Sequence, residues 1–354
     1  MKALLALLIT VSVCVFALAG TAFWFSHELN TPVPVKHDVE VEIPAGFTPD
    51  ATLNRLSEVG IIQHTLPLKL YLKFSHAGSR FKAGVYTFPS EVSPLAVLHI
   101  LESGGKPFGK ITVIEGWTRW DIAQALLQSP TLGLKTKEQA LKLLNNTKSI
   151  KDLDKSAKNL EGYLYPDTYY FTSKTTAQEL IDQFVARFHQ VWSEKLGARA
   201  GSVKVSPHDV VTVGALIETE AKLSSERPII ASVIYNRLGR KMTLSLDSSL
   251  IYASKLANAW RNDGKVYQSD IDRKSPYNTR QNIGLPPGPI ASPGLSAMEA
   301  ALNPASTTYL YYVRNPSRND GAHNFYNNPA DFEIGVLALR NWEQQQLARA
   351  KKKK

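Results

Sequence analysis

The chain begins with a run of apolar residues long enough to cross a bilayer as a helix. No charged residue lies between Ala3 and Ser26, and about 20 apolar residues span the hydrocarbon core. Residues 17–19, Ala-Leu-Ala, resemble a signal-peptide cleavage site. The run continues past them to Trp24 and Phe25, where interfacial aromatic residues are expected. The pattern predicts an uncleaved anchor and the start of a linker over residues 1–30. A cleaved leader is the alternative, and either one exports the rest of the chain.

A strand-then-helix pattern follows. Val39, Val41 and Ile43 alternate with polar residues, which predicts a strand, and Thr48 is placed to cap a helix. The same order of strand, Gly-x-Thr turn and helix recurs around Thr118. This unit resembles the start of a LysM module, a small peptidoglycan-binding fold; two ordinary strand–helix units are the alternative. We expect a LysM-like subdomain over residues 31–108, including a strand at 82–88 and a helix at 95–101.

The remainder of the chain reads mainly as helix. Leu180, Phe184, Phe188 and Trp192 recur at fourfold spacing, which predicts an amphipathic helix over residues 176–196. Residues 129–160 also look mostly helical and polar. The predicted fold class is α+β: an N-terminal transmembrane helix, a small LysM-like βα subdomain, and a larger, mostly helical catalytic domain with short strands over residues 109–345. A basic tail over 346–354 completes the chain.

Composition narrows the possible chemistry. The net charge is +10, part of it from the terminal lysine run 351–354. We find no nucleic-acid module and no Gly-rich phosphate loop, so a membrane surface or an anionic wall polymer suits the charge at least as well. The one cysteine, Cys14, lies in the apolar run. The exported part therefore has no thiol for a disulfide, for catalysis or for a cysteine zinc site, and no H-E-x-x-H motif is present.

One predicted helix combines strong start signals with acidic residues. Ser206 is the expected cap, Pro207 takes the first helical position, and an apolar run leads to Glu218 and Glu220. Burying a carboxylate is costly, so both glutamates are candidates for function.

The two glutamates lie on different faces of this helix. Helical spacing places Glu218 beside Gly214 and Ala215, which leaves room for a ligand. Partial burial there would raise the pKa of Glu218 and keep it protonated as an acid. Glu220 lies on a bulkier face, and we expect it to pair with a cation, Arg227 or Arg237. The alternative that both glutamates simply form ion pairs stays open.

Several further motifs occur in a fixed order along the chain. Together they resemble the membrane-anchored endolytic murein transglycosylases, the YceG-like or aminodeoxychorismate-lyase-like family, over roughly residues 39–337. The segments that carry the resemblance are 160–170 (LEGYLYPDTYY), 217–220 (IETE), 233–238 (VIYNRL), 246–247 (LD), 277–279 (YNT), 284–290 (GLPPGPI), 292–294 (SPG) and 323–325 (HNF). Ser245, Ser248 and Arg280 depart from the family pattern, in which Gln, Pro and an aromatic residue are usual.

The resemblance implies a lytic transglycosylase. Such an enzyme cleaves the bond between N-acetylmuramic acid and N-acetylglucosamine, leaves 1,6-anhydro ends, and would terminate glycan elongation. It implies that Glu218 is the single acid/base, with no cofactor and no metal. The candidate substrate-binding residues are Glu161, Asn236, Asp247, Tyr252, Tyr277, Asn278 and Thr279.

The expected location is the inner membrane, with a single span and the catalytic body in the periplasm. The implied partners are glycan strands of peptidoglycan, the membrane and penicillin-binding proteins of the wall-synthesis machinery, and no nucleic acid. Two rival functions remain at this stage. One is a muramidase that hydrolyses the same bond, with Asp247 or Glu220 positioning water. The other is a non-catalytic scaffold that binds the wall.

Overall fold

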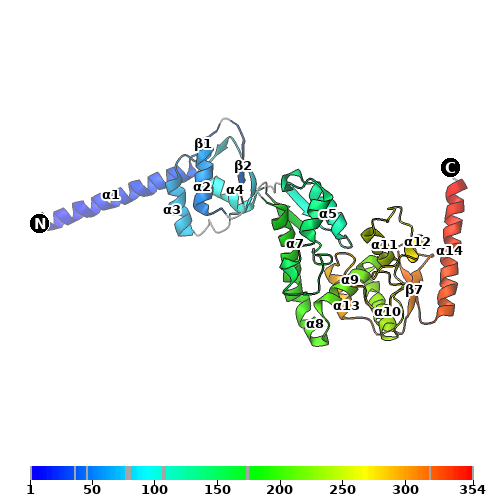
Figure 1. The fold of residues 1–354 in the computed structure, drawn as a ribbon. Helices are drawn as coiled ribbons and strands as arrows, with labels where there is room; N and C mark the ends of the chain where they lie inside the picture. The colour runs from blue at the N-terminus through cyan, green and yellow to red at the C-terminus, as the bar shows by residue number, and fades with distance from the viewer. Residues whose placement is uncertain are drawn as a thin grey trace. The chain divides into compact units, whose positions relative to one another are not determined.

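The computed structural model describes residues 2–35, 37–44, 47–75, 81–105, 109–172, 175–318 and 320–352. They form two compact units (Figure 1). Unit 1 contains Met1–Lys110 and Tyr170–Thr175, and unit 2 contains Ile111–Tyr169 and Thr176–Lys354. Each unit is described by itself.

Unit 1 begins with helix α1, Lys2–Asn30. Its part from Thr10 to Asn30 is long and apolar enough to cross a membrane, by length and composition, and it is not buried within the protein. This helix fits the predicted single-span anchor. Its last turn differs from the rest, because Leu29 belongs to the hydrophobic core of unit 1.

The core of unit 1 lies between a two-stranded sheet and three helices. Strands β2 (Val39–Ile43) and β3 (Gly84–Phe88) pair antiparallel, and helices α2 (Pro49–Glu58) and α3 (Thr65–Ser75) connect them. Helix α4 (Pro94–Ser103) follows, and β1 (Val33–Pro34) pairs with β4 (Glu91–Val92). The strand predicted at 39–43 is confirmed, and so are the strand ending at Phe88 and the helix at 95–101. The side chains of Leu53, Leu56, Leu68, Phe88 and Leu98 fill the interior.

The helix caps in these segments form as predicted. The Thr48 hydroxyl accepts a hydrogen bond from the backbone N–H of Ala51 at 3.2 Å. The backbone N–H of Thr118 donates to the carboxylate of Asp121 at 2.9 Å, at the start of α5 (Arg119–Leu127). The turn predicted at residues 44–46 lies partly outside the described residues. The two strand–helix units differ in how their strands pair. Strand β2 pairs with β3, whereas β5 (Gly109–Thr112) pairs with β6 (Thr168–Phe171), which lies more than 50 residues later in the sequence.

The segment 129–160 is much less helical than its polar pattern predicted. It holds α6 (Lys137–Leu144) and single 3-10 turns at Pro130–Leu132 and Lys148–Ile150. Pro130 and Gly133 interrupt helix formation by removing a donor and by adopting a positive φ, respectively. Turns follow the second of these 3-10 turns, and the side chains of Leu160 and Tyr163 are buried there.

A long amphipathic helix supports one side of unit 2. Helix α7 (Ala177–Val191) is capped by the Thr176 hydroxyl and buries Leu180, Phe184 and Phe188, as their spacing predicted. A π-helical turn, Trp192–Leu196, continues it and leads into α8 (Gly197–Val203).

Helix α9 (Pro207–Glu220) is the central element of unit 2 (Figure 1). The Ser206 hydroxyl caps it, accepting from the backbone N–H of Asp209 at 3.1 Å. Every residue from Val210 to Ile217 is buried, as expected for a helix surrounded on all sides. It contacts α8, α10 (Arg227–Gly239), α11 (Asp247–Leu256) and α13 (Leu295–Leu302).

The C-terminal part of unit 2 combines a hairpin with a helix. The short helix α12 (Gln268–Ile271) comes first. Strands β7 (Tyr311–Arg314) and β8 (His323–Tyr326) then pair antiparallel, and α14 (Pro329–Lys352) packs on them, with the rings of Tyr311 and Phe332 at 5.1 Å. The predicted basic tail is therefore helical as far as Lys352, and residues 353–354 lie outside the described part.

Gly162 gives a direct test of packing around α9. Its φ is +82°, and an added Cβ would lie 2.6 Å from Pro289 and 2.7 Å from Val211. Because the backbone conformation and the space both oppose a side chain, we expect Gly162→Ala to lower the free energy of unfolding by about 2–4 kcal/mol. Gly201→Ala is the matched control. That helical position has open space, so thermal or urea unfolding should show a gain of up to about 1 kcal/mol. Equal effects at both positions would contradict this packing.

Candidate active site

The candidate site is built on the last turn of α9. Glu218 and Glu220 are two residues apart, so their side chains leave the helix about 200° apart. The C-terminal end of a helix carries a partial negative charge, which disfavours a nearby carboxylate. Burial adds to this effect and raises the pKa of both glutamates. The two carboxyl groups differ in the contacts that offset the free-energy cost of burying them.

The Glu218 carboxylate is held by a cation and a backbone amide. Its Oε1 accepts a hydrogen bond from Arg227 Nη2 at 2.6 Å, and its Oε2 accepts from the Gly294 N–H at 2.9 Å. Only 6% of its side chain is exposed. Burial raises the pKa of Glu218, while Gly294 and Arg227 lower it and Glu115 raises it. Both direct partners favour the ionised form.

The surroundings of Glu218 are closely packed. Arg227 Nη2 also lies 3.5 Å from a carboxylate oxygen of Glu115, and a Cβ on Gly294 would lie 1.9 Å from Glu115. The sequence predicted space for a ligand above the Glu218 carboxyl group. One turn earlier on the same face, Met298 and Pro293 pack against Gly214, 3.0 and 3.4 Å from where a Cβ would stand.

Among the described residues, no cation lies within 4.0 Å of the Glu220 carboxyl group. Oε1 accepts from the Ser248 hydroxyl at 2.7 Å, and Oε2 accepts from the Tyr312 hydroxyl at 2.9 Å. Burial is the main cause that raises the pKa of Glu220. The two hydroxyls lower it, the Asp247 charge raises it, and His323 lowers it.

The predicted pairing of Glu220 with Arg227 or Arg237 is wrong. Arg227 binds Glu218 instead. Arg237 donates to the backbone carbonyls of Leu310 and Leu244 at 2.5 and 2.7 Å, so its guanidinium is used to hold loops together.

Glu220 lines an open cavity of ≈490 Å³, which we call the Glu220 cleft. Asp247 and Arg280 form an ion pair in its wall, with Arg280 Nη2 2.6 Å from a carboxylate oxygen of Asp247. Both side chains are substantially exposed. Tyr311 and Tyr312 supply aromatic surface. The cleft thus combines an acid with a raised pKa, a second carboxylate, a cation and aromatic rings. These are groups that can bind and protonate a sugar.

Three of the predicted substrate-binding residues hold the framework rather than line the cleft. Asn278 and Thr279 are 0% and 2% exposed. The Asn278 amide donates to the carbonyls of Ile271 and Arg273, both at 2.9 Å. The Thr279 hydroxyl accepts from the Leu246 N–H at 3.0 Å. The Asn236 amide donates to the carbonyls of Thr307 and Tyr309. Asn278 and Thr279 thus hold the segments next to Arg280 and Asp247, and Asn236 holds the segment that leads into β7.

Glu161, Tyr252 and Tyr277 form a separate cluster. Glu161 accepts from the Arg119 N–H at 2.9 Å and from the Tyr252 hydroxyl at 3.1 Å. Burial raises the pKa of Glu161 to about 7, against the lowering effect of Arg119. The rings of Tyr252 and Tyr277 lie 4.8 Å apart. Asp247 is therefore the one predicted substrate-binding residue that shares the Glu220 cleft.

The sequence reasoning gave no role to Tyr312 and treated Ser248 and Arg280 only as departures from a family pattern. The available signal for a strand there was the run of aromatic and apolar residues at 309–313, Tyr-Leu-Tyr-Tyr-Val. It could not show that Tyr312 reaches the end of α9.

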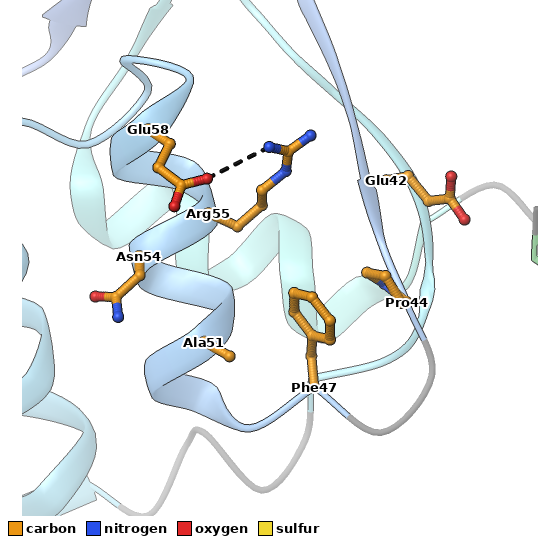
Figure 2. A pocket seen from close by; sticks show the side chains of 7 residues that line it. All are labelled: Glu42, Pro44, Phe47, Ala51, Asn54, Arg55 and Glu58. Atoms are coloured by element: carbon orange, nitrogen blue, oxygen red, sulfur yellow. Dashed lines mark hydrogen bonds and ion pairs between the residues drawn. The ribbon is translucent and has the colours of Figure 1, made fainter. Parts of the chain in front are cut away.

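A second open cavity, of ≈570 Å³, lies in unit 1 (Figure 2). It is lined by the Phe47 ring, the Asn54 amide and the charged residues Glu42, Arg55 and Glu58, with Pro44 and Ala51. Arg55 Nη1 lies 3.4 Å from Glu58. The groove therefore offers charged and amide groups beside one aromatic ring.

Residues 41–336 match the model of the YceG-like family. The chain belongs to that family. A curated relative from Bacillus subtilis, named endolytic murein transglycosylase, is 34% identical over 83% of this chain and 84% of its own length. A relative of the same name from Streptococcus pneumoniae is 30% identical over 90% of this chain, which covers 62% of that longer protein. The crystal structure of a yceG-like protein from Listeria monocytogenes is 31% identical, with a TM-score of 0.58, over 85% of this chain and 99% of that one.

These matches confirm the family expected from the motifs and the enzyme class, lytic transglycosylase. They leave open which side chain is the acid. The contacts of Glu218 and Glu220 bear on that question.

A double-mutant cycle tests the role of Glu218. Arg227→Met keeps similar bulk but leaves Glu218 buried without its cation, so we expect the free energy of unfolding to fall by about 3–5 kcal/mol. Glu218→Gln should cost less, because Arg227 keeps Glu115 nearby. The double variant should lose at least about 1 kcal/mol less than the sum of the two. Purely additive losses in urea unfolding would show that the pair is not coupled.

Proposed function

We propose that this chain is an endolytic lytic transglycosylase that cuts peptidoglycan glycan strands, with Glu220 as its acid/base. The observation that carries the proposal is the Glu220 carboxyl group. It lies in an open cleft, bonded only to hydroxyls among the described side chains, with a pKa raised by burial. The names of the relatives support the substrate and reaction class.

Glu220 suits the acid better than Glu218, which the sequence favoured. A general acid must hold a proton at the working pH and reach the substrate. Glu218 is bound to Arg227 and to the Gly294 N–H, and only 6% of its side chain is exposed, so it cannot donate a proton without losing an ion pair. Glu220 loses no ion pair when protonated and opens onto a cavity. Glu218 instead positions the turn that ends α9.

One carboxyl group can perform both steps of the reaction. Protonated Glu220 donates to the glycosidic oxygen as the bond from C1 of N-acetylmuramic acid breaks. The Glu220 carboxylate then removes the proton from the C6 hydroxyl of the same sugar, whose oxygen bonds to C1 and closes a 1,6-anhydro ring. The proton returns to Glu220, and no water is consumed. The hydroxyls of Ser248 and Tyr312 hold the carboxyl group in place and stabilise its charge between the two steps.

A muramidase is the alternative for the same cleft. Asp247 is a second carboxylate there and could activate a water molecule, since hydrolytic glycosidases use two carboxylates. Its ion pair with Arg280 argues against a base, because the guanidinium stabilises the charge that a base must give up. A positioning or charge-stabilising role beside the sugar suits Asp247 better.

Unit 1 provides attachment in this proposal. Helix α1 would hold the protein in the inner membrane, with unit 2 in the periplasm, near penicillin-binding proteins that make new strands. A cut at that place would terminate glycan elongation. The strand–helix–helix–strand order of residues 39–88 and the groove beside Phe47 would give a LysM-like contact with the wall. A scaffold without catalysis would leave the Glu220 cleft unexplained.

Paired substitutions decide between the two glutamates. Glu220→Gln is nearly isosteric but cannot give and recover a proton, so we expect cleavage of purified glycan strands to fall by about 10²–10⁴-fold. Glu218→Gln, measured on protein shown by circular dichroism to be folded, should retain most of its rate. The sequence-based assignment predicts the reverse result. An inactive but folded Glu218→Gln variant, together with an active Glu220→Gln variant, would restore it.

Mass spectrometry of the released sugar ends separates the rival functions. We expect 1,6-anhydro ends, which carry one water molecule less than reducing ends. Reducing ends alone would identify a muramidase. Absence of any new ends with the intact, membrane-anchored protein would favour the scaffold.

The pH dependence tests Glu220 in a second way. Because Glu220 must be protonated to act, activity should fall as the pH rises through its pKa. The Ser248 hydroxyl lowers that pKa, so Ser248→Ala should raise it and move the high-pH limb of kcat/KM to higher pH. Ser245→Ala, at a neighbouring residue with no bond to Glu220, is the control and should leave the limb in place. A limb that Ser248→Ala leaves unmoved, or moves to lower pH, is inconsistent with Glu220 as the titrating acid.

A further inference from the structure

Another cavity in unit 2, of ≈260 Å³, lies apart from the Glu220 cleft and has no role in the reaction proposed for Glu220. Two of the six tryptophans of the chain, Trp120 and Trp260, line it. The first stands at the start of α5, and the second lies in the loop that follows α11. Indole rings offer a flat apolar face with little conformational entropy to lose, which suits the C–H face of a pyranose.

The Trp120 ring is fixed from two sides. It contacts the Tyr252 ring at 5.2 Å, and the Arg119 guanidinium lies 4.7 Å from its centre. Tyr252 is itself buried and bonded to Glu161. The aromatic wall of the cavity is therefore held in place by the interior of unit 2.

The loop that carries Trp260 presents unused polar groups. Asn258 and Asn262 both have positive φ, +51° and +57°, a conformation that asparagine tolerates better than most residues. Both line the cavity, and among the described residues neither side-chain amide makes a hydrogen bond. Amides beside aromatic rings can bond the hydroxyl and N-acetyl groups of a sugar.

The charge of the cavity favours an acidic ligand. Lys255 lies 3.8 Å from Asp121, and both line the cavity. Lys137, at the start of α6, also lines it and has no carboxylate within 4.0 Å among the described residues. Two lysines against one aspartate leave a net charge of +1, and the ammonium group of Lys137 is available for a carboxylate.

Helix α11 connects this cavity to the Glu220 cleft. Ser248, which bonds Glu220, and Lys255 are seven residues apart on α11 and so lie on the same face, two turns from each other. Their Cα atoms are about 10 Å apart along the axis. That separation is roughly the length of one disaccharide.

We propose that the cavity lined by Trp120, Trp260, Lys137 and Asn262 is a remote subsite for the glycan strand. It takes an N-acetylated sugar about one disaccharide from the cut, with a carboxylate of that unit on Lys137. The carboxylate comes from the lactyl group or from the stem peptide. This inference rests on the proposed function and assigns the enzyme a preference for long strands.

The test uses the full-length protein and purified, uncross-linked glycan strands. We measure kcat/KM for long strands and for a tetrasaccharide, and take the ratio of the two. Trp260→Ala should lower this ratio roughly tenfold, and Asn262→Ala and Lys137→Ala should lower it severalfold. Trp342→Ala on α14 and Lys142→Ala on α6, two positions outside the cavity, should keep the wild-type ratio.

Strands with and without stem peptides distinguish the sources of the carboxylate. A loss in Lys137→Ala confined to strands with stem peptides assigns it to the peptide. A loss confined to strands without stem peptides assigns it to the lactyl group, whose carboxylate is free only there, and a loss on both shows that Lys137 binds whichever of the two carboxylates the strand carries. An unchanged ratio in both Trp260→Ala and Asn262→Ala overturns the subsite. That result differs from failure of the proposed function, in which the wild-type protein cuts neither substrate.

Discussion

The structure of unit 2 depends on the burial of helix α9. Eight consecutive residues, Val210 to Ile217, are buried, and the helix then ends in two glutamates. Desolvation and the negative end of the helix both oppose two carboxylates at this place. Each must therefore find partners in the surrounding segments, and those partners determine how the neighbouring loops are arranged.

The two solutions differ in kind. The cost of burying Glu218 is offset by an ion pair with Arg227 and a hydrogen bond from the Gly294 N–H. These contacts tie α9 to α10 and to the start of α13. Such an ion pair is costly to break, and it favours the ionised form against the burial that raises the pKa of Glu218. The cost of burying Glu220 is offset by hydrogen bonds with two hydroxyl groups, which can bond the carboxyl group in either protonation state. A single helix end can thus supply one structural and one reactive carboxyl group.

Helix α11 connects the C-terminal end of α9 with another cavity of unit 2. Its first turn carries Asp247, which lines the Glu220 cleft, and Ser248, which bonds Glu220, and its far end leads to the cavity with Trp260. The buried side chain of Tyr252 lies between them and joins the aromatic wall to Glu161. A rigid helix between two polar cavities gives a fixed spacing, which suits a polymer with a regular repeat better than a small, single ligand.

The sequence by itself determined the local elements and the family. Cap residues, fourfold apolar spacing and strand alternation act over a few residues, so α7, α9, β2 and the helix after Thr48 were predictable, and the ordered motifs identified the YceG-like family. Tertiary structure decided which groups the two glutamates contact. Spacing showed that Glu218 and Glu220 face opposite ways, but not that the Gly294 N–H meets the first while Ser248 and Tyr312 meet the second. Those contacts join residues 28 to 92 positions apart, and desolvation depends on such long-range packing rather than on neighbours in the chain.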